Sequence, residues 1–429
     1  MKTVLQFFAL VLLTSTCALA QSQYKALYSF SGTDGSAPSS LILGRSGNFY
    51  GVTQSGGTGT ASNCPYGCGT VFSLSSSDGN WTLTTLYQFC SVASCLDGNT
   101  PTSALVSDSN GNLYGATQFG GSKNKGTIFE LSRSAGKWTE TVLYNFCSVG
   151  ENCPDGEEPS GAIALDAQGN LYGATVAGGS GCSFYVTPGC GAAFELSPPS
   201  SPGAAWTERV IYNLCATAEG TQCPDGYSPL GGLTLGKSGN LFGTASYGGL
   251  YSSQCFQGCG TVFMLHPQAT GWSSKLLYAP ASPIGGEFPV APLSANSAGG
   301  VYGSFAQGGE VGAGVLFQLS ATGKGSEYSL LPGNDDNPTA AVIAGGGVLY
   351  GSAYGSQVDA DYGSVFQVTP KAKEAILHTF CSEALCADGS GPLALVQDKA
   401  GNIYGVTTSG GNNTCTGNAG CGVVFEIKP

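Results

Sequence analysis

The chain has 429 residues, of which 68 are glycine and only 10% are charged, and its formal net charge at pH 7 is −12. Glycine without a three-residue period excludes collagen, and the interspersed Leu, Tyr, Phe and Val residues exclude a disordered chain. An acidic surface repels phosphate backbones and anionic lipids, so we expect no nucleic acid partner.

The first 20 residues have the three parts of a secretory signal peptide. Lys2 precedes an apolar run at residues 4–13, and Ala-Leu-Ala follows at 18–20 as a cleavage site. The run is too short to span a bilayer, and no later segment is apolar enough to do so. Cys17 raises the alternative of a lipoprotein anchor, but residues 14–16 form a poor lipobox. We therefore expect export of a mature chain, residues 21–429, that forms a single domain.

A short motif organises this mature chain. It reads Gly-Asn-Leu-Tyr-Gly-Ala-Thr at residues 111–117, and complete or weaker copies recur 48–70 residues apart. Intervals of this size are typical of solenoids, propellers and arrays. The aromatic position of the motif is occupied, in order, by Tyr50, Tyr114, Tyr172, Phe242, Tyr302, Tyr350 and Tyr404.

Each repeat contains four short apolar runs. In the second repeat they lie at residues 103–106, 112–117, 126–131 and 138–146, separated by Gly, Asn and Ser. Such runs, rich in aromatic and β-branched residues, predict four antiparallel strands, and no helical period occurs outside the signal peptide. The Leu-Tyr and Ile-Phe doublets place apolar groups on both faces of each sheet. Each sheet must therefore be covered on both faces by neighbouring sheets, as in a β-propeller.

The two ends of the mature chain are complementary. Residues 24–30 match a fourth strand, whereas residues 424–427, near the end of the chain, match a third strand. Pairing them closes the ring and removes two sheet edges. We therefore predict an all-β fold, a seven-bladed β-propeller of four-stranded antiparallel blades, closed by the N-terminal strand in the last blade. A β-helix would need a shorter period, and separate modules would not need complementary ends.

The cysteines form close pairs. Of the 17, Cys17 leaves with the signal peptide, and 16 remain. An even number in an exported protein predicts disulfides, and the members of a pair appear and vanish together between repeats, which favours bonds within each loop. A metal site is the disfavoured alternative, because no histidine lies near the closest pairs. The predicted disulfides are Cys64–Cys68, Cys90–Cys95, Cys147–Cys153, Cys182–Cys190, Cys215–Cys223, Cys255–Cys259, Cys381–Cys386 and Cys415–Cys421.

The repeated unit, Gly-Asn-Leu-Tyr-Gly-Ala-Thr followed by Gly-Cys-Gly-Thr-Val-Phe-Glu-Leu and Leu-Tyr-x-Phe-Cys, resembles the tandem GloVer repeats of secreted bacterial choice-of-anchor proteins. It is similar more loosely to kelch-type propellers. The resemblance covers nearly the whole mature chain and implies an exported repeat protein, but it supplies no catalytic residues. The sequence stops at residues 427–429 without a hydrophobic sorting tail, so we expect free secretion.

Catalytic chemistry has few candidates. His378 stands where other repeats have tyrosine, and His266 lies at a turn; neither has an obvious nucleophile partner. A structural role is therefore favoured over a general base, and we predict no catalytic residue, cofactor or metal.

Five aspartates recur in Asp-Gly pairs before the proline that starts a blade. Such a ring of acids can bind Ca²⁺ or sugar hydroxyls, or provide an acid/base pair for glycoside cleavage. Ordinary turn chemistry is the favoured alternative, because a catalytic pair would not recur in five blades. The candidate ligand-binding residues are Asp34, Asp97, Asp155, Asp225 and Asp388.

In a four-stranded meander, the loops from fourth to first strands and from second to third strands share one face. We expect a monomeric, non-enzymatic binding scaffold whose ligand, with a polysaccharide as the candidate, occupies this cysteine-rich face. A carbohydrate-active enzyme would instead show two unlike acids in one cleft at the axis, one with a raised pKa. A structural surface or adhesion protein would have no concave site. The fold itself does not decide among them.

Overall fold

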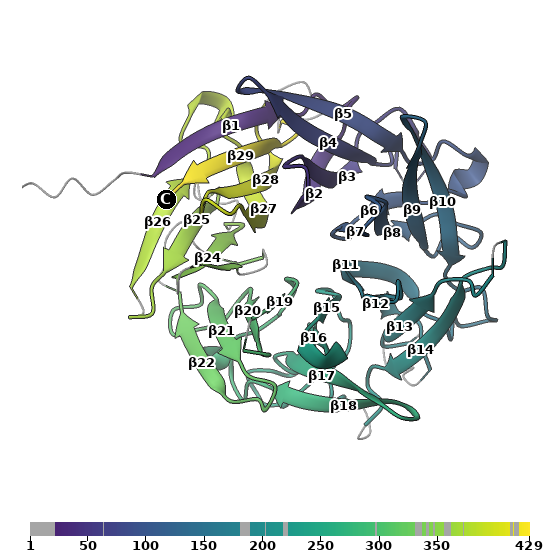
Figure 1. Cartoon of the computed structure of the whole chain (residues 1–429). Helices are drawn as coiled ribbons and strands as arrows, with labels where there is room; N and C mark the ends of the chain where they lie inside the picture. The colour runs from purple at the N-terminus through teal and green to yellow at the C-terminus, as the bar shows by residue number, and fades with distance from the viewer. Residues whose placement is uncertain are drawn as a thin grey trace, which may run out of the picture.

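Seven antiparallel sheets surround a central axis (Figure 1). The computed structural model describes residues 22–429 except 63, 181–188, 202, 218–221, 297, 331–336, 340–342, 346–347, 356–361, 372, 412–414 and 416–419. Six sheets have four strands, and in the remaining sheet the innermost strand is divided into β6 and β7. The predicted all-β, seven-bladed propeller is confirmed. The expected signal peptide lies outside the described residues.

Each blade runs outward from the axis, with its first strand innermost (Figure 1). Blades 1 to 3 comprise β2 (Ser36–Leu43), β3 (Phe49–Ser55), β4 (Thr70–Ser77) and β5 (Asn80–Gln88); β6 (Asn99–Pro101), β7 (Val106–Ser107), β8 (Leu113–Phe119), β9 (Thr127–Ser134) and β10 (Lys137–Asn145); and β11 (Glu157–Leu165), β12 (Leu171–Ala177), β13 (Ala192–Ser197) and β14 (Thr207–Asn213). Blades 4 and 5 comprise β15 (Leu233–Leu235), β16 (Leu241–Ala245), β17 (Thr261–Gln268) and β18 (Gly271–Tyr278), then β19 (Ser294–Ala295), β20 (Val301–Phe305), β21 (Val315–Leu319) and β22 (Gly325–Ser329). Blades 6 and 7 comprise β23 (Ile343–Gly345), β24 (Val348–Ala353), β25 (Ser364–Val368) and β26 (Glu374–Thr379), then β27 (Ser390–Gln397), β28 (Ile403–Ser409), β29 (Val423–Lys428) and β1 (Gln23–Ser29).

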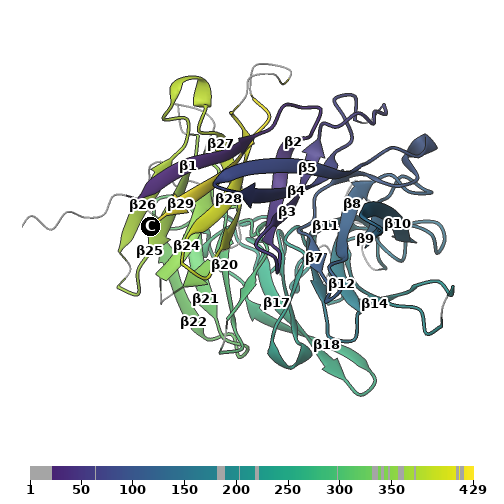
Figure 2. The same ribbon diagram turned by 45° about the horizontal axis from the view of Figure 1, so that its top comes forward.

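The N-terminal strand closes the ring. β1 pairs antiparallel with β29, with Tyr24 opposite Ile427 and Ser29 opposite Val423, and the two strands lie side by side in both views (Figures 1 and 2). The last blade thus obtains its fourth strand from the other end of the chain, as the sequence predicts. This pairing leaves neither strand with an open hydrogen-bonding edge at the junction.

The glycine of the motif is required by a ring that lies over it. Gly115 in β8 pairs with Phe129 in β9, and a Cβ atom added at Gly115 would lie 2.5 Å from Cζ of Phe129. The equivalent glycine and phenylalanine are paired in the other six blades. The phenylalanine is buried in every blade, so this contact is the constant centre of the repeat.

Adjacent blades are joined by aromatic side chains. Trp138 of blade 2 packs against Tyr50 of blade 1 with ring centroids 6.4 Å apart, and Trp272 of blade 4 packs against Tyr172 of blade 3 at 5.7 Å. The tryptophan stands at the start of the fourth strand, and the tyrosine is the motif tyrosine of the preceding blade. In this way blade 2 covers part of blade 1, and blade 4 covers part of blade 3.

Helical structure within the described ranges is limited to single turns. Four short 3₁₀ turns occur in loops, η1 (Ala93–Cys95), η2 (Lys237–Gly239), η3 (Pro283–Gly285) and η4 (Ala384–Cys386). None of the helices found in these ranges has the length and apolarity needed to traverse a bilayer.

Candidate functional site

The candidate site is the loop face, which we define as the loops from second to third strands and those entering each first strand. Antiparallel pairing within each blade places both sets at the same end of the ring. Seven predicted disulfides are confirmed there; in the eighth, Cys182 lies outside the described residues. The observed bonds are Cys64–Cys68, Cys90–Cys95, Cys147–Cys153, Cys215–Cys223, Cys255–Cys259, Cys381–Cys386 and Cys415–Cys421.

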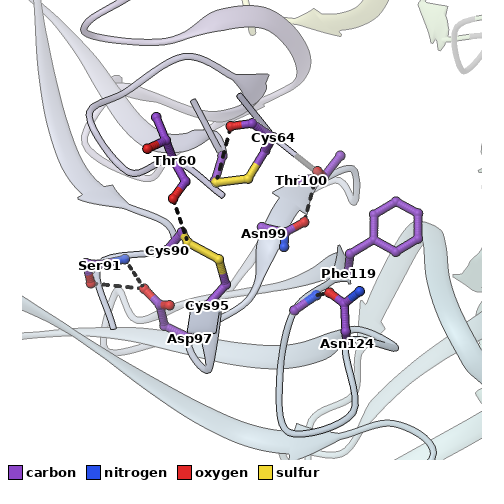
Figure 3. Close-up of a disulfide and its surroundings, with 12 residues drawn as sticks. Thr60, Cys64, Cys90, Ser91, Cys95, Asp97, Asn99, Thr100, Phe119 and Asn124 are labelled. Atoms are coloured by element: carbon purple, nitrogen blue, oxygen red, sulfur yellow. Dashed lines mark hydrogen bonds between the residues drawn. A yellow bond between two sulfur atoms is a disulfide. The ribbon is translucent and has the colours of Figure 1, made fainter. Parts of the chain in front are cut away.

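Asp97 shows what the Asp-Gly turns do. One of its carboxylate oxygens accepts hydrogen bonds from the Ser91 backbone N–H at 2.8 Å and the Tyr87 hydroxyl at 2.8 Å, and the side chain is only 1% exposed. Figure 3 shows the carboxylate directed at Ser91, beside the Cys90–Cys95 disulfide. Gly98 follows with φ +92°, and a Cβ there would lie 2.4 Å from Oγ1 of Thr117. Only glycine fits this close approach in the left-handed region.

The same contact recurs at the other four aspartates. Each carboxylate accepts a hydrogen bond from a fourth-strand side chain and from a backbone N–H in the loop that follows. These contacts hold the loops, and the predicted ligand-binding role of the aspartates stays a prediction. The donors are Tyr28 and Ser31 to Asp34, Tyr144 and Ser148 to Asp155, Tyr212 and Ala216 to Asp225, and His378 and Ser382 to Asp388.

His378 takes the place of the usual tyrosine, as its position in the sequence indicates. Its Nε2 lies 3.1 Å from Oδ2 of Asp388, and its ring stacks on Tyr24 with centroids 3.9 Å apart. Burial alone would raise the pKa of Asp388, but hydrogen bonds from His378 and Ser382 outweigh burial and hold that pKa below its ordinary value. His266 is exposed, and its Nδ1 lies 2.5 Å from the Asn240 side chain.

Two glutamates add acidic pairs that the sequence did not reveal. Burial, and secondarily the charge of Asp97, raises the pKa of Glu140 to about 7. Burial, and secondarily the charge of Asp155, raises the pKa of Glu208 to about 7 in the same way. Both glutamates lie in fourth strands, at the outside of the ring. Each pair consists of two unlike acids, of which the glutamate has a raised pKa. An enzyme site was expected to be a single pair at the axis, whereas this pair occurs twice and lies away from the axis.

The concave feature of this face is an axial pocket of about 340 Å³. All seven blades contribute, mainly through the residues that directly follow the proline at the start of the blade. No ionisable side chain occurs among the described residues of its lining. The repeated motif gives no sign of the pocket, because the residues that line it differ from blade to blade. The wall comprises Ser39, Ser40, Leu41, Gln54, Thr102, Ala104, Ser160, Gly161, Leu230, Val290, Pro292, Thr339, Leu393, Ala394 and Leu395.

Four hydroxyl groups in this wall lack a hydrogen-bond partner. They belong to Ser39, Ser40, Thr102 and Thr339, and their oxygens are buried. A buried polar group without a partner costs about 1–3 kcal/mol, so groups of this kind need an explanation.

The loops around the pocket also expose apolar side chains. Tyr66 lies within the Cys64–Cys68 ring and is 70% exposed, and Phe256 lies within the Cys255–Cys259 ring and is 79% exposed. Nine of the twelve large apolar side chains found exposed in the described ranges lie in loops of this face. The remaining seven on this face are Val92, Leu96, Val149, Leu250, Ile284, Val311 and Leu385.

The closed ring and its shared loop face define a β-propeller. Residues 15–187 match the family model described as the Gloeobacter/Verrucomicrobia repeat. These residues therefore match repeats of the type that the motif indicates. No curated protein matches it.

Solved structures show the same fold at low sequence identity. A catalytically inactive variant of virginiamycin B lyase from Staphylococcus aureus, crystallised with quinupristin, is 12% identical, with a TM-score of 0.55; the match covers 95% of this chain and 100% of that one. The WD40 β-propeller domain of Doa1 is 10% identical, with a TM-score of 0.51, over 95% and 97% of the two chains. At this identity, the likeness concerns the fold alone.

Proposed function

We propose that this protein is an exported, non-enzymatic binding scaffold whose ligand occupies the loop face over the axial pocket. The observation that carries the proposal is the pocket itself, a concave site of ligand size to which every blade contributes. The disulfides favour an extracellular or periplasmic location, since such bonds persist in oxidising compartments. The apolar run and the Ala-Leu-Ala site at residues 4–20 support export through a signal peptide.

The chemistry of the pocket favours an uncharged polyhydroxylated ligand, which we propose to be a polysaccharide. Its wall combines hydroxyl and amide groups, such as Thr102 and Gln54, with aliphatic side chains, such as Leu230 and Leu395. A sugar ring offers the matching combination of hydroxyl groups and C–H surfaces. The hydroxyls of Ser39 and Ser40 have no hydrogen-bond partner within the protein, and a serine hydroxyl can both donate to and accept from a sugar hydroxyl.

The surrounding loops support an extended ligand rather than a single sugar. Tyr66 and Phe256 present aromatic rings at the tips of disulfide-closed loops on different blades. A short disulfide ring restricts the backbone that carries the aromatic side chain, so the loop loses less freedom on binding, which favours affinity. The aspartates contribute by fixing the loops from below, as Asp97 fixes the turn that carries the Cys90–Cys95 disulfide.

Thermal unfolding of the secreted, oxidised protein in the presence of soluble polysaccharides tests this proposal. A ligand at about 100 times its dissociation constant adds roughly 2.7 kcal/mol to the free energy of unfolding, which gives a clear increase in Tm. Each glycan is measured with Ca²⁺ and with chelator. An increase with Ca²⁺ alone would identify the Asp-Gly turns as metal sites instead.

A matched pair of variants locates the ligand. Ala104→Leu narrows the axial pocket, and we expect it to abolish the increase in Tm produced by a binding glycan. Ala135→Leu, in the exposed β9–β10 turn at the opposite end of the ring, should leave the increase unchanged. An absence of any increase across the panel would contradict the polysaccharide proposal and favour a protein ligand or a structural role.

A further inference from the structure

The interface between blades 2 and 3 shows how a tryptophan fills the gap between neighbouring blades. Trp206, just before β14, packs against Tyr114 with ring centroids 6.3 Å apart. It lies on a buried cluster that includes Ile128, Leu171 and Leu196. Blade 3 therefore covers blade 2 with one indole ring, as blades 2 and 4 do for the blades before them.

The interface between blades 5 and 6 has apolar residues at the positions that contact Trp206 in blades 2 and 3, and the strands are in the same register. Tyr302 pairs with Gln318 as Tyr114 pairs with Glu130, so Tyr302 and the neighbouring Leu316 correspond to Tyr114 and Ile128. By the same comparison, Leu349 and Val368 form a pair equivalent to that of Leu171 and Leu196.

The tryptophan is missing from blade 6. Its fourth-strand sequence, Ala-Lys-Glu at residues 372–374, aligns with Trp-Thr-Glu at residues 206–208. Ala372 itself lies outside the described residues, but the neighbouring strands are in register with those of blade 3. The sequence thus has alanine at the position where blade 3 has tryptophan.

A cleft of about 430 Å³ lies where the ring would pack. Its floor and walls include Tyr302, Leu316, Leu349, Val368 and Pro370. At its edge are the exposed side chains of Gln318 and Glu327, whose oxygens can accept a hydrogen bond from an indole N–H. The volume falls in the range of small-ligand pockets.

We propose that this cleft between blades 5 and 6 binds a tryptophan side chain presented by a partner polypeptide. The internal repeat identifies the occupant, because three other interfaces of the molecule fill this position with tryptophan. An apolar cavity shaped for a side chain retains affinity for a free group of the same shape. The proposed site is adjacent to the β25–β26 turn, at the end of the ring opposite the loop face, and is independent of the proposed function.

Isothermal titration of the secreted protein with N-acetyl-L-tryptophanamide tests the inference. We expect saturable binding at one site, and no binding of N-acetyl-L-alaninamide. Ala372→Trp supplies the missing ring and should weaken binding at least tenfold. Trp206→Ala opens the equivalent cleft beside Tyr114 and should create a second binding site. Circular dichroism checks that both variants fold. If Trp206→Ala does not fold, Trp138→Ala is used in its place.

Several outcomes overturn the proposal. One is a native protein that does not bind the tryptophan derivative, whether or not Trp206→Ala binds it. Another is binding that Ala372→Trp leaves unchanged, which would place the ligand elsewhere. A third is equally tight binding of N-acetyl-L-alaninamide, which would show that the cleft does not recognise an indole ring.

Discussion

Blades 2 and 3 differ from blades 5 and 6 in the side-chain contacts that hold their loops, although the strands of all four blades pair in the same way. At the start of blade 3, the Tyr144 hydroxyl donates to the Asp155 carboxylate at 2.8 Å. At the start of blade 5, Gly285-Gly286 stands in place of an Asp-Gly pair. The Tyr278 hydroxyl there donates to the Gly285 backbone carbonyl at 3.4 Å and not to an aspartate. The sequence also has no cysteine between Cys259 and Cys381. The paired glycine and phenylalanine are present in both regions. That contact therefore suffices to define a blade, while aspartates, disulfides and tryptophans add local stability.

The largest difference in stability between the two regions should appear when the aspartate contact is removed. Asp155→Ala leaves the Ser148 N–H and the Tyr144 hydroxyl without their charged acceptor, and Asp155 is 2% exposed. We expect the free energy of unfolding, measured in urea, to fall by about 3 kcal/mol. Tyr278→Phe, which removes the tyrosine hydroxyl contact at the start of blade 5, should cost less than about 1 kcal/mol. Equal losses in the free energy of unfolding would show that the loops of the two regions are held equally strongly.

A somewhat smaller effect should follow the loss of a tryptophan. Trp138 is half-buried against Tyr50, so Trp138→Ala should cost about 2–3 kcal/mol, less than for a fully buried ring. Ala372→Trp should instead raise the free energy of unfolding, because its cleft is already formed. The two changes are compared by urea unfolding, and a loss of stability with Ala372→Trp would contradict the equivalence of the two interfaces.

Removing one disulfide should have a still smaller effect. The Cys147–Cys153 bond closes a ring with a sequence separation of 6. Such a short ring restricts the unfolded chain little, so replacing both cysteines with alanine should cost about 2 kcal/mol. Differential scanning calorimetry at matched pH provides the measurement, with Asp155 left intact. No change in Tm would mean that the Asp155 contact alone holds this loop.

The smallest effect concerns pH. Glu140 and Glu208 ionise near pH 4.5 when exposed but near pH 7 in the folded protein. Between these values the unfolded chain has released protons that the folded chain retains. The stability from the two groups is therefore complete below about pH 4.5 and falls as pH rises through 7. Replacing both with glutamine should raise Tm at pH 8 and flatten the decline between pH 5 and 8. A decline of unchanged slope in the double variant would assign it to other groups.

The architecture was predictable because short sequence motifs that repeat along the chain determine it. Seven copies of one motif define the blades, and the unmatched strand sequences at residues 24–30 and 424–427 indicate how the ring closes. The disulfides were predictable from the repeats, because the two members of a close pair, such as Cys90 and Cys95, are present or absent together. Such features depend on neighbours in the sequence, so the sequence alone is sufficient to find them.

The candidate site was harder to predict, because it depends on positions that do not repeat. Ser39 and Thr339, from blades 1 and 6, line one pocket only after the ring has closed. Glu140 reads as an ordinary outer-strand residue, and its raised pKa depends on burial beside Asp97 of the loop entering its blade. The missing tryptophan of blade 6 was a visible signal, since Ala372 departs from the repeat, but its meaning required the register of the neighbouring strands.

Hydrogen exchange of the secreted protein, with and without a polysaccharide that raises its Tm, tests the central claim most directly. If the loop face is the binding surface, protection should increase in the β3–β4 loop around Tyr66, the β16–β17 loop around Phe256, and the first-strand residues beside Thr102. The turns between first and second strands, at the opposite end of the ring, should be unchanged. Protection confined to those turns, with none in the loops or at the axis, would contradict the account.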